Sequence, residues 1–264
     1  MSSLKRALAV LDVFTSDRPA WTAEAIAQAL GYSVPTVYRY LRELSEVGLL
    51  RGESGAHFVL GPRIIELDYQ MRTADPLISV GRDSMRRLAD ATGCDVVLVT
   101  LFGEHIVTIH QEFGSEGVSA SYGRGRRMPV FKGAMSKCLL AALSKPQLRK
   151  LHAQQSAQAQ QGDAASSVPS WDELQAQTRQ VRQQGYALTR GELDSDNVGI
   201  AVPLTSPAHN LVATLGFIMS SQRVELLEIK RAVALLQGCV EEIKARLAAP
   251  PARDYLAELA RPAA

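Results

Sequence analysis

Residues 22–48, TAEAIAQALGYSVPTVYRYLRELSEVG, decide the fold at the start of this chain. Thr22 is a residue type that caps helix starts and Gly31 is one that ends helices, so the two bound a first predicted helix. Ser33 begins a second predicted helix, which runs to residue 47. Two helices joined by so short a connection form a helix-turn-helix. The apolar residues expected to face inward are Ile26, Ala29, Leu30, Val34, Val37, Leu41, Leu44 and Val47.

The sequence on either side adds a third helix and a hairpin. Residues 4–16 are predicted to form a helix, because apolar residues recur there every three to four positions. Residues 49–51 and 57–60 are predicted strands, separated by a polar Gly-Glu-Ser-Gly turn. Together these elements predict a winged helix-turn-helix over residues 1–62. The apolar face of the first helix is expected to be Leu4, Leu8, Leu11 and Phe14.

The outer face of the second helix carries side chains that can read DNA. A recognition helix lies in the major groove and needs donors on its projecting face. Arg39 and Arg42 could reach phosphates or guanine edges there, and Arg51, near the hairpin, could reach a backbone phosphate. The acidic Glu43 and Glu46 lie toward the far end of the helix. The predicted DNA-binding residues are Thr22, Ser33, Thr36, Tyr38, Arg39, Tyr40, Arg42, Arg51 and His57.

The net charge gives no support of its own to nucleic-acid binding. The chain has 264 residues, with 29 Lys+Arg and 27 Asp+Glu, and a net charge of +2. Residues 1–66 contain seven basic and seven acidic side chains. A helical bundle with a solvated face is therefore the alternative interpretation. The DNA prediction depends on where individual arginines point.

Residues 77–248 mix helical and strand periodicities, which predicts an α+β domain. The expected helices are 77–92, 133–143, 171–184 and 223–247, and the expected strands are 95–102, 106–113, 186–189, 200–204 and 211–219.

Four segments around and within this domain have a distinct character. A helix over 63–76 is predicted to link it to the winged domain. The helix over 223–247 is expected to cover a sheet face, and a coiled coil is the alternative. The segment 153–168 is rich in Gln, Ala and Ser, although a helix is possible there, and the tail 249–264 is rich in proline. Both are predicted to be poorly ordered.

Other function classes lack their sequence signatures. No apolar run reaches the ~18–20 residues that span a bilayer, so no membrane partner is expected. The phosphate loop, the G-x-S-x-G elbow and the H-E-x-x-H pair are missing from the sequence. His105 and His110 would point to opposite sides of a strand, so we expect no shared metal ion there. With the enzyme motifs missing as well, we expect no cofactor and no catalytic residue. The cysteines are far apart and odd in number, which fits reduced thiols in the cytoplasm; they are Cys94, Cys138 and Cys239.

Short fragments, each weak alone, follow one another in a specific order along the chain. In the first part they are LKRALAVL at 4–11, Ala25-Ile26-Ala27, Leu30-Gly31, Thr36, Arg39, Leu41, Gly48-Leu49 and Leu60-Gly61-Pro62-Arg63. In the second part they are GRRMP at 125–129, Gly185-Tyr186, Gly191-Glu192, IAVPL at 200–204 and Ser221-Gln222-Arg223. Over about residues 3–247 the chain resembles the IclR family of bacterial transcriptional regulators.

The resemblance implies a winged helix-turn-helix domain, 1–62, a linker helix, 63–76, and a GAF-like effector-binding domain, 77–248. It also implies a homodimer or dimer of dimers on palindromic operator DNA, regulating a catabolic operon. Residues 33–35 read Ser-Val-Pro, where the family often has Pro, a basic residue and Ser, so a phosphate contact at Val34 is lost. The operator sequence, and whether the chain represses or activates, are not predicted.

The resemblance also implies a pocket between the sheet and the helix that follows the Gly-Arg-x-x-Pro segment, where family members commonly bind carboxylates. The family's acidic residue, cysteine and two serines are replaced at the matching positions by Thr189, Gly199, Gly216 and Ile218. A roomier, less polar pocket favours an aromatic carboxylate. The expected effector-binding residues are Arg124, Met128, Phe131, Ala134, Met135, Thr189, Gly199, Gly216 and Ile218, with Phe131 stacking, Arg124 complementing charge, and the amides of Ala134 and Met135 receiving an anion.

Several interpretations stay open alongside these. The glycines and Ile218 could be ordinary strand packing, with the effector lost or bound elsewhere. A basic cluster is interpreted as a solvated or subunit-facing loop, in preference to a second nucleic-acid surface; it is Arg124, Arg126, Arg127, Lys132 and Lys137. Asp194 and Asp196 fit a solvated loop. The alternative function is a small-molecule sensor or enzyme whose N-terminal helices serve dimerisation only.

Overall fold

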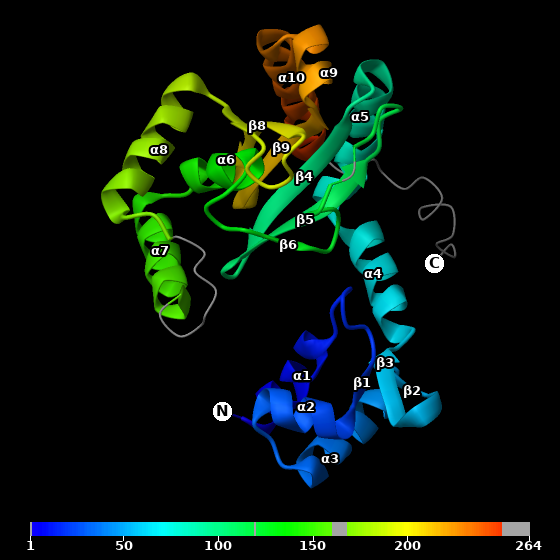
Figure 1. The fold of residues 1–264 in the computed structure, drawn as a ribbon. Helices are drawn as coiled ribbons and strands as arrows, with labels where there is room; N and C mark the ends of the chain where they lie inside the picture. Colours follow the sequence, from blue (N-terminus) through cyan, green and yellow to red (C-terminus); the bar gives the residue numbers. More distant parts are fainter. Residues whose placement is uncertain (1, 119, 160–167, 250–264) are drawn as a thin grey trace, which may run out of the picture. The chain divides into compact units, whose positions relative to one another are not determined.

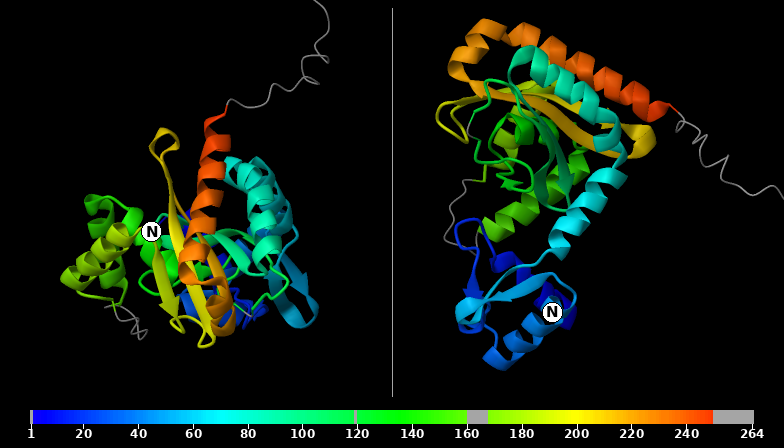
Figure 2. Two further views of the ribbon diagram at one scale, coloured as in Figure 1. Left: turned by 90° about the horizontal axis from the view of Figure 1, so that it is seen from above. Right: turned by 90° about the vertical axis from the view of Figure 1, so that its right-hand side faces the viewer.

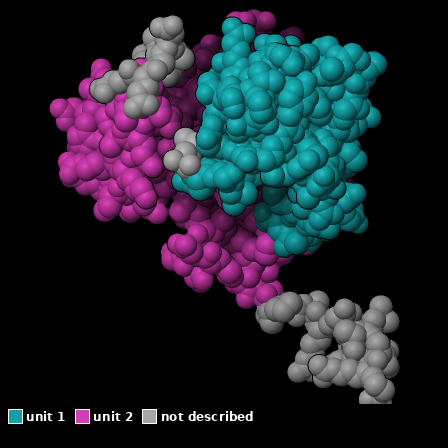
Figure 3. Space-filling model, turned by 90° about the horizontal axis from the view of Figure 1, so that it is seen from below, with its two compact units in different colours: residues 1–75 teal, residues 76–264 magenta. Residues whose placement is uncertain are grey.

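The buried apolar side chains of the computed structural model fall into three clusters, one before position 60 and two after position 76. The structure describes residues 2–118, 120–159 and 168–249. The chain divides between Asp75 and Pro76 into two compact units (Figures 1 and 3). No helix in the described ranges is long and apolar enough to cross a membrane.

The first unit has the predicted helix-turn-helix and wing. Three helices surround one apolar cluster, and a small antiparallel sheet has the strand order β1-β3-β2. The two-residue strand β1 was not predicted. The elements are α1 (Ser3–Ala9), a 3-10 turn (Leu11–Val13), β1 (Trp21–Thr22), α2 (Ala23–Leu30), α3 (Val34–Glu46), β2 (Leu50–Glu53), a second 3-10 turn (Ser54–Ala56), β3 (His57–Leu60) and α4 (Arg63–Ala74).

The predicted inward face of the first helix is wrong at Leu4 and Leu8, whereas Leu11 and Phe14 pack against the apolar cluster. α1 ends at Ala9, far short of residue 16, and the chain then tightens into a 3-10 turn, so the apolar spacing does not continue on one face. Ala7 and Val10 are buried instead, while Leu4 is 69% exposed and Leu8 is also exposed. Two large apolar side chains therefore lie on the surface of α1.

Two inward positions in the helix-turn-helix are also wrong. Val47 is exposed because it follows the last residue of α3 and has left the helical register. Ala29 is exposed because the buried face of α2 consists of Ala23, Ile26 and Ala27. The other predicted core positions of α3 remain close to the apolar cluster.

The second unit is built on a six-stranded antiparallel sheet with the order β6-β5-β4-β9-β8-β7. Its helices are α5 (Pro76–Thr92), α6 (Ala134–Ala142), α7 (Lys145–Ala159), α8 (Trp171–Gln184), α9 (Ser221–Leu227) and α10 (Ile229–Ala248). Its strands are β4 (Asp95–Phe102), β5 (His105–Glu112), β6 (Arg127–Met128), β7 (Ala187–Arg190), β8 (Asn197–Ser206) and β9 (Leu211–Ser220), with a 3-10 turn (Pro207–His209) between the last two.

Each face of this sheet is covered by helices (Figure 2). Strand residues alternate between the faces, so Val96 and Leu98 join the cluster under α5 and α10, while Val97 and Val99 join the cluster under α6. α8 packs on α6. α6 is therefore held between the sheet and another helix, with its first residue, Ala134, against β8.

Two helix predictions in this unit need correction. The segment from residue 153, predicted to be poorly ordered with a helix as the alternative, continues α7 as far as Ala159, so the helix is what the structure has. Buried Leu148 and Leu151 anchor it. The single helix predicted over 223–247 is broken at Glu228, whose φ of 59° separates α9 from α10. The predictions of poor order for 160–167 and 250–264 fall outside the described residues.

Candidate DNA interface and effector pocket

The turn between α2 and α3 is set by its capping residues. The Thr22 hydroxyl accepts a hydrogen bond from the Ala25 amide at 3.3 Å and starts α2. Gly31 ends α2 with a φ of 66°, a conformation that costs glycine little. Ser33 stands before α3, but its hydroxyl bonds the Thr36 hydroxyl at 2.8 Å and not a backbone amide. Thr22 and Ser33 thus shape the motif, and both remain proposed DNA contacts.

The projecting face of α3 is exposed and only weakly paired. Tyr38, Arg39 and Arg42 are exposed, as predicted from the spacing. Arg42 lies 3.8 Å from Glu46, and the Tyr38 hydroxyl donates to Glu24 Oε1 at 3.2 Å. Exposed pairs of this kind contribute about 0–1 kcal/mol, so a phosphate can replace them at little cost.

Tyr40 does not project, which corrects its assignment as a DNA-binding residue. Its exposed fraction is 1%, and its ring lies edge-on to Tyr32 with centroids 6.3 Å apart. The hydroxyl lies 3.4 Å from the Ser3 hydroxyl oxygen. Position 40 is one turn beyond buried Val37 and beside buried Leu41, so it belongs to the inner face of α3.

The wing offers one exposed cation and one half-buried imidazole. Arg51 on β2 is exposed and pairs with Glu53 at 2.9 Å. His57 begins β3, opposite Thr22 of β1 and Glu53 of β2. The hairpin thus fixes Arg51 on an outer strand, whereas His57 lies in the central one.

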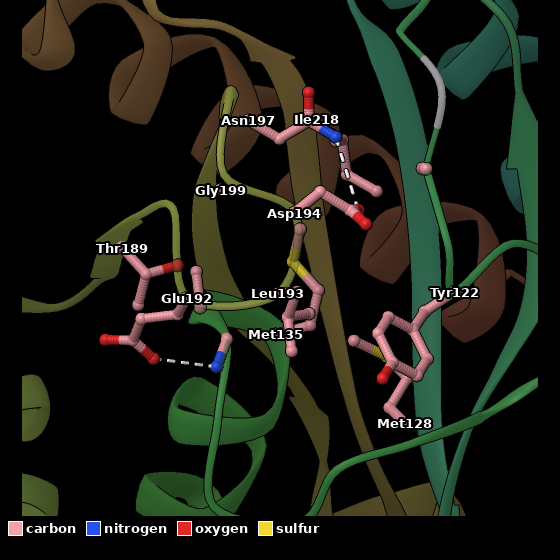
Figure 4. A pocket seen from close by; sticks show the side chains of 13 residues that line it. Tyr122, Met128, Met135, Thr189, Glu192, Leu193, Asp194, Asn197, Gly199 and Ile218 are labelled. Carbon is pink, nitrogen blue, oxygen red and sulfur yellow. Dashed lines mark hydrogen bonds between the residues drawn. The ribbon is translucent and has the colours of Figure 1, made fainter.

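A cavity of about 40 Å³ lies at the first turn of α6, between that helix and the sheet (Figure 4). Its walls are mostly apolar. Six of the nine predicted effector residues line it: Met128, Ala134, Met135, Thr189, Gly199 and Ile218. Seven further residues complete the lining: Ala120, Tyr122, Gly133, Glu192, Leu193, Asp194 and Asn197.

Three predicted effector residues lie outside this lining. Arg124 Nε donates to the Ile109 carbonyl at 2.8 Å, which ties the side chain to strand β5. Phe131 lies in the wall of a neighbouring cavity of about 400 Å³. A Cβ at Gly216 would overlap the Met135 sulfur, so the space above that glycine is filled. Of the two glycines expected to enlarge the pocket, Gly199 lines it and Gly216 makes room for Met135.

The first turn of α6 already holds a carboxylate from its own chain. Glu192 Oε2 accepts a hydrogen bond from the Gly133 amide at 2.9 Å (Figure 4). Lys137 Nζ donates to Glu192 Oε1. Gly133 has a φ of 85°, and a Cβ there would lie 2.7 Å from Leu193 Cδ1. Among the described residues, the amides of Ala134 and Met135 have no hydrogen-bond acceptor. The predicted anion donors are thus free beside an occupied one.

Two more polar side chains define the cavity. Thr189 on β7 is 8% exposed, and its hydroxyl has no hydrogen-bond partner in the described part of the chain. Asp194 accepts hydrogen bonds from the Ser121 amide at 3.1 Å, the Ser121 hydroxyl and Asn197 Nδ2 at 3.3 Å. Burial raises the pKa of Asp194, but these hydrogen bonds outweigh it and lower the pKa below its ordinary range. Asp194 therefore fastens a loop that was predicted to be merely solvated.

The basic cluster near residue 124 is engaged in part, while Arg126, Arg127 and Lys132 are exposed. Lys137 is paired with Glu192, and Arg126 donates to the Ser121 carbonyl at 2.8 Å. Arg124 is tied to β5. These side chains hold the segment before α6 against its neighbours.

Comparison with known proteins identifies the family. A model described as the IclR helix-turn-helix domain matches residues 3–54, and one described as the bacterial transcriptional regulator IclR C-terminal matches residues 71–245. The Pca regulon regulatory protein of Pseudomonas putida is 25% identical to this chain, over 88% of it and 78% of the relative.

Solved structures share the fold. An IclR family transcriptional regulator from Brucella abortus has a TM-score of 0.77 and 24% identity, covering 95% of this chain and 93% of that one. An IclR homologue from Microbacterium hydrocarbonoxydans, complexed with 4-hydroxybenzoate, has a TM-score of 0.74 and 23% identity, covering 93% and 99%. The matched families are regulators and not enzymes. The chain belongs to the IclR family of bacterial transcriptional regulators, with an N-terminal helix-turn-helix domain that implies DNA binding and a C-terminal effector domain.

Proposed function

We propose that this regulator controls a catabolic operon in response to a small aromatic carboxylate bound at the first turn of α6. One observation carries the proposal: a mostly apolar cavity is lined by Ala134 and Met135, whose amides have no acceptor among the described residues, and by Thr189, whose hydroxyl has no hydrogen-bond partner there. Amides at a helix start bind anions, and apolar walls suit an aromatic ring. One relative controls the Pca regulon, and one structural neighbour binds 4-hydroxybenzoate.

On DNA, we propose that Arg39, Arg42 and Arg51 contact palindromic operator DNA, with Thr36, Tyr38 and His57 beside them. The support is the exposure of the arginines on α3 and β2 and the weakness of their present ion pairs. Since Tyr40 is buried, it supports this surface from below.

A dimer or dimer of dimers is the proposed state on DNA. α4 has no buried residue, and its Ile65 and Tyr69 are 71% and 62% exposed. α1 adds exposed Leu4 and Leu8. Apolar side chains of this size, gathered on two helices of one unit, favour contact with a second copy. The ligand would then act by a population shift, stabilising one arrangement of paired DNA-binding domains over another.

The DNA part is tested on full-length protein with a palindromic fragment recovered by in vitro selection. The double variant Arg39→Ala/Arg42→Ala is expected to lose roughly 1–3 kcal/mol per arginine that reads a base, and to reduce the slope of log K against log salt by about 1 per lost phosphate contact. Arg86→Ala removes a similarly exposed, paired arginine from α5 and serves as the matched control. Unchanged affinity of the double variant would contradict the assignment of α3.

The effector part is tested by calorimetry with a panel of acids. Benzoate and 4-hydroxybenzoate are expected to bind, and acetate and glyoxylate to bind much more weakly, because only an aromatic ring makes extensive apolar contact with the cavity walls. A regulator that bound only the short oxo-acid would contradict the aromatic proposal. The acid that binds should also change the affinity of the protein for its operator when the DNA-binding titration is repeated in its presence.

A further inference from the structure

The loop between β7 and β8 places one carboxylate where an anionic ligand would bind. Glu192 accepts from the Gly133 amide and pairs with Lys137, one helical turn further along α6. The carboxylate is half-buried, with 32% of the Glu192 side chain exposed and 24% of Lys137. An anion at a helix start is stabilised by the free amides and the helix dipole. Glu192 therefore has the interactions that a ligand carboxylate would need.

The same loop separates two cavities. Glu192 and Leu193 line both the 40 Å³ cavity and the neighbouring 400 Å³ cavity, and Tyr122 and Met128 face them across the gap. Leu193 packs over Gly133, which can accept it only because it has no Cβ. Asp194 fastens the far end of the loop to Ser121. The loop thus forms a wall between the two cavities, and it is held in place by the hydrogen bonds of Glu192 at one end and of Asp194 at the other.

The inner cavity is too small for the proposed ligand while this wall is closed. A cavity needs roughly 10–15 Å³ of water-accessible space to hold one water, so about 40 Å³ holds only a few waters. Pockets that bind small organic ligands have volumes of roughly 300–1,000 Å³. The outer cavity, at about 400 Å³, already lies in that range, and opening the wall formed by Glu192 and Leu193 would connect it to the start of α6; Tyr122 and Met128 line both cavities as well.

We propose that Glu192 is a tethered competitor of the effector. Its carboxylate holds the Gly133 amide and Lys137 in the unliganded chain, and the carboxylate of a monoanionic ligand displaces it and opens the loop. This inference rests on the proposed function, that the effector is a carboxylate. Thr189 is an independent sign of a ligand, because the residue is only 8% exposed, lines the cavity, and its hydroxyl has no hydrogen-bond partner among the described residues.

The proposal predicts that removing the charge of Glu192 strengthens ligand binding. The wild-type ligand must break a charge-assisted contact before it binds, whereas a neutral side chain competes less well for Lys137. Glu192→Gln keeps the size of the side chain but has one acceptor oxygen in place of two, so it cannot accept from the Gly133 amide and Lys137 through separate oxygens. We expect it to bind 4-hydroxybenzoate and benzoate at least ~10-fold more tightly than wild type.

The test is calorimetry on full-length wild type, Glu192→Gln and Asp196→Asn. Asp196 is an exposed carboxylate of the same loop outside the cavity lining, so its amide variant controls for the change in net charge. Hydrogen exchange without ligand is the second measurement, and the Gly133 amide and residues 191–197 should exchange faster in Glu192→Gln than in wild type.

Each outcome decides. Tighter binding by Glu192→Gln alone, with faster loop exchange, supports the competitor. Weaker binding by Glu192→Gln would show that Glu192 contacts the ligand and would overturn the proposal, while the carboxylate effector would stand. An equal gain in Asp196→Asn would reduce the effect to general electrostatics and also overturn it. No acid binding to any of the three proteins would instead remove the carboxylate effector itself, and the competitor with it.

Discussion

α3 and α6 each begin where an anion is expected, and they treat that position differently. The first turn of α3 is open, because Ser33 and Thr36 bond only one another. Further along the helix, Arg39 is exposed and Arg42 carries one weak, exposed ion pair. The first turn of α6 is occupied by Glu192 and covered by Leu193. A surface that binds a long polyanion such as DNA can leave its helix start open. A pocket that selects one small anion gains specificity when a carboxylate of its own chain competes for the same donors.

The difference extends to what lies beneath each helix. α3 rests on a small core in which Tyr40 is the largest fully buried side chain. α6 is packed on a sheet and under α8, with Met135 filling the space over Gly216. The position of α3 therefore depends on the buried ring of Tyr40, whereas the position of α6 depends on close packing against the sheet.

The largest expected effect tests the support of α3. Tyr40→Ala should lower the free energy of unfolding by about 3–5 kcal/mol, because it leaves a large cavity in a small core. Tyr40→Phe should cost about 1 kcal/mol or less and keep operator affinity, because it removes only the hydroxyl contact to Ser3. Urea denaturation and a DNA-binding titration on each variant measure both quantities. Operator binding lost in Tyr40→Phe at wild-type stability would return Tyr40 to the DNA interface.

A smaller effect separates packing from pocket at α6. Gly216→Ala should lower the free energy of unfolding by about 1–3 kcal/mol, because the new Cβ overlaps the Met135 sulfur and lies 2.6 Å from the Ile200 carbonyl oxygen. Gly199→Ala adds the same methyl to the cavity wall, 3.2 Å from the Ala134 Cβ, and should weaken acid binding more than it changes stability. Thermal denaturation and calorimetry on the pair measure this, and equal stability losses would place Gly199 in the packing and not in the pocket.

The features that could be predicted from the sequence are those set by neighbours in the chain. The helix-turn-helix follows from Thr22, Gly31 and the apolar spacing of α2 and α3, all within one short segment. α8 follows from a capping box at Ser170 and a glycine at its end. Such signals act locally and need no knowledge of the tertiary fold.

What could not be predicted depends on contacts between distant residues. Glu192 meets Gly133 from 59 positions away, and the only signal was its place in the Gly191-Glu192 fragment. Gly216 was interpreted as open space because a sequence does not show that Met135 occupies it. Counting only Val and Leu positions as the buried stripe leaves Tyr40 on the projecting face of α3, whereas the helix turns its ring inward. Six of the nine predicted effector residues therefore line one cavity, but its closure by Glu192 and Leu193 could not be predicted.

The smallest expected effect concerns the second fastening of the loop over α6. The pKa of Asp194 lies below its ordinary 3.8, so its hydrogen bonds stabilise the fold above pH 3.8, and that contribution is lost as the pH falls through the lowered value. Asp194→Asn should therefore be less stable than wild type by about 1 kcal/mol at pH 7, a value reduced by partial exposure. Urea denaturation at pH 7, 5, 4 and 3 should show the gap closing only below pH 3.8, with Asp196→Asn as the control. If the difference in free energy of unfolding stayed the same at pH 3, packing and not the charge of Asp194 would hold the loop. The contrast between the occupied start of α6 and the open start of α3 would then depend on Glu192 alone.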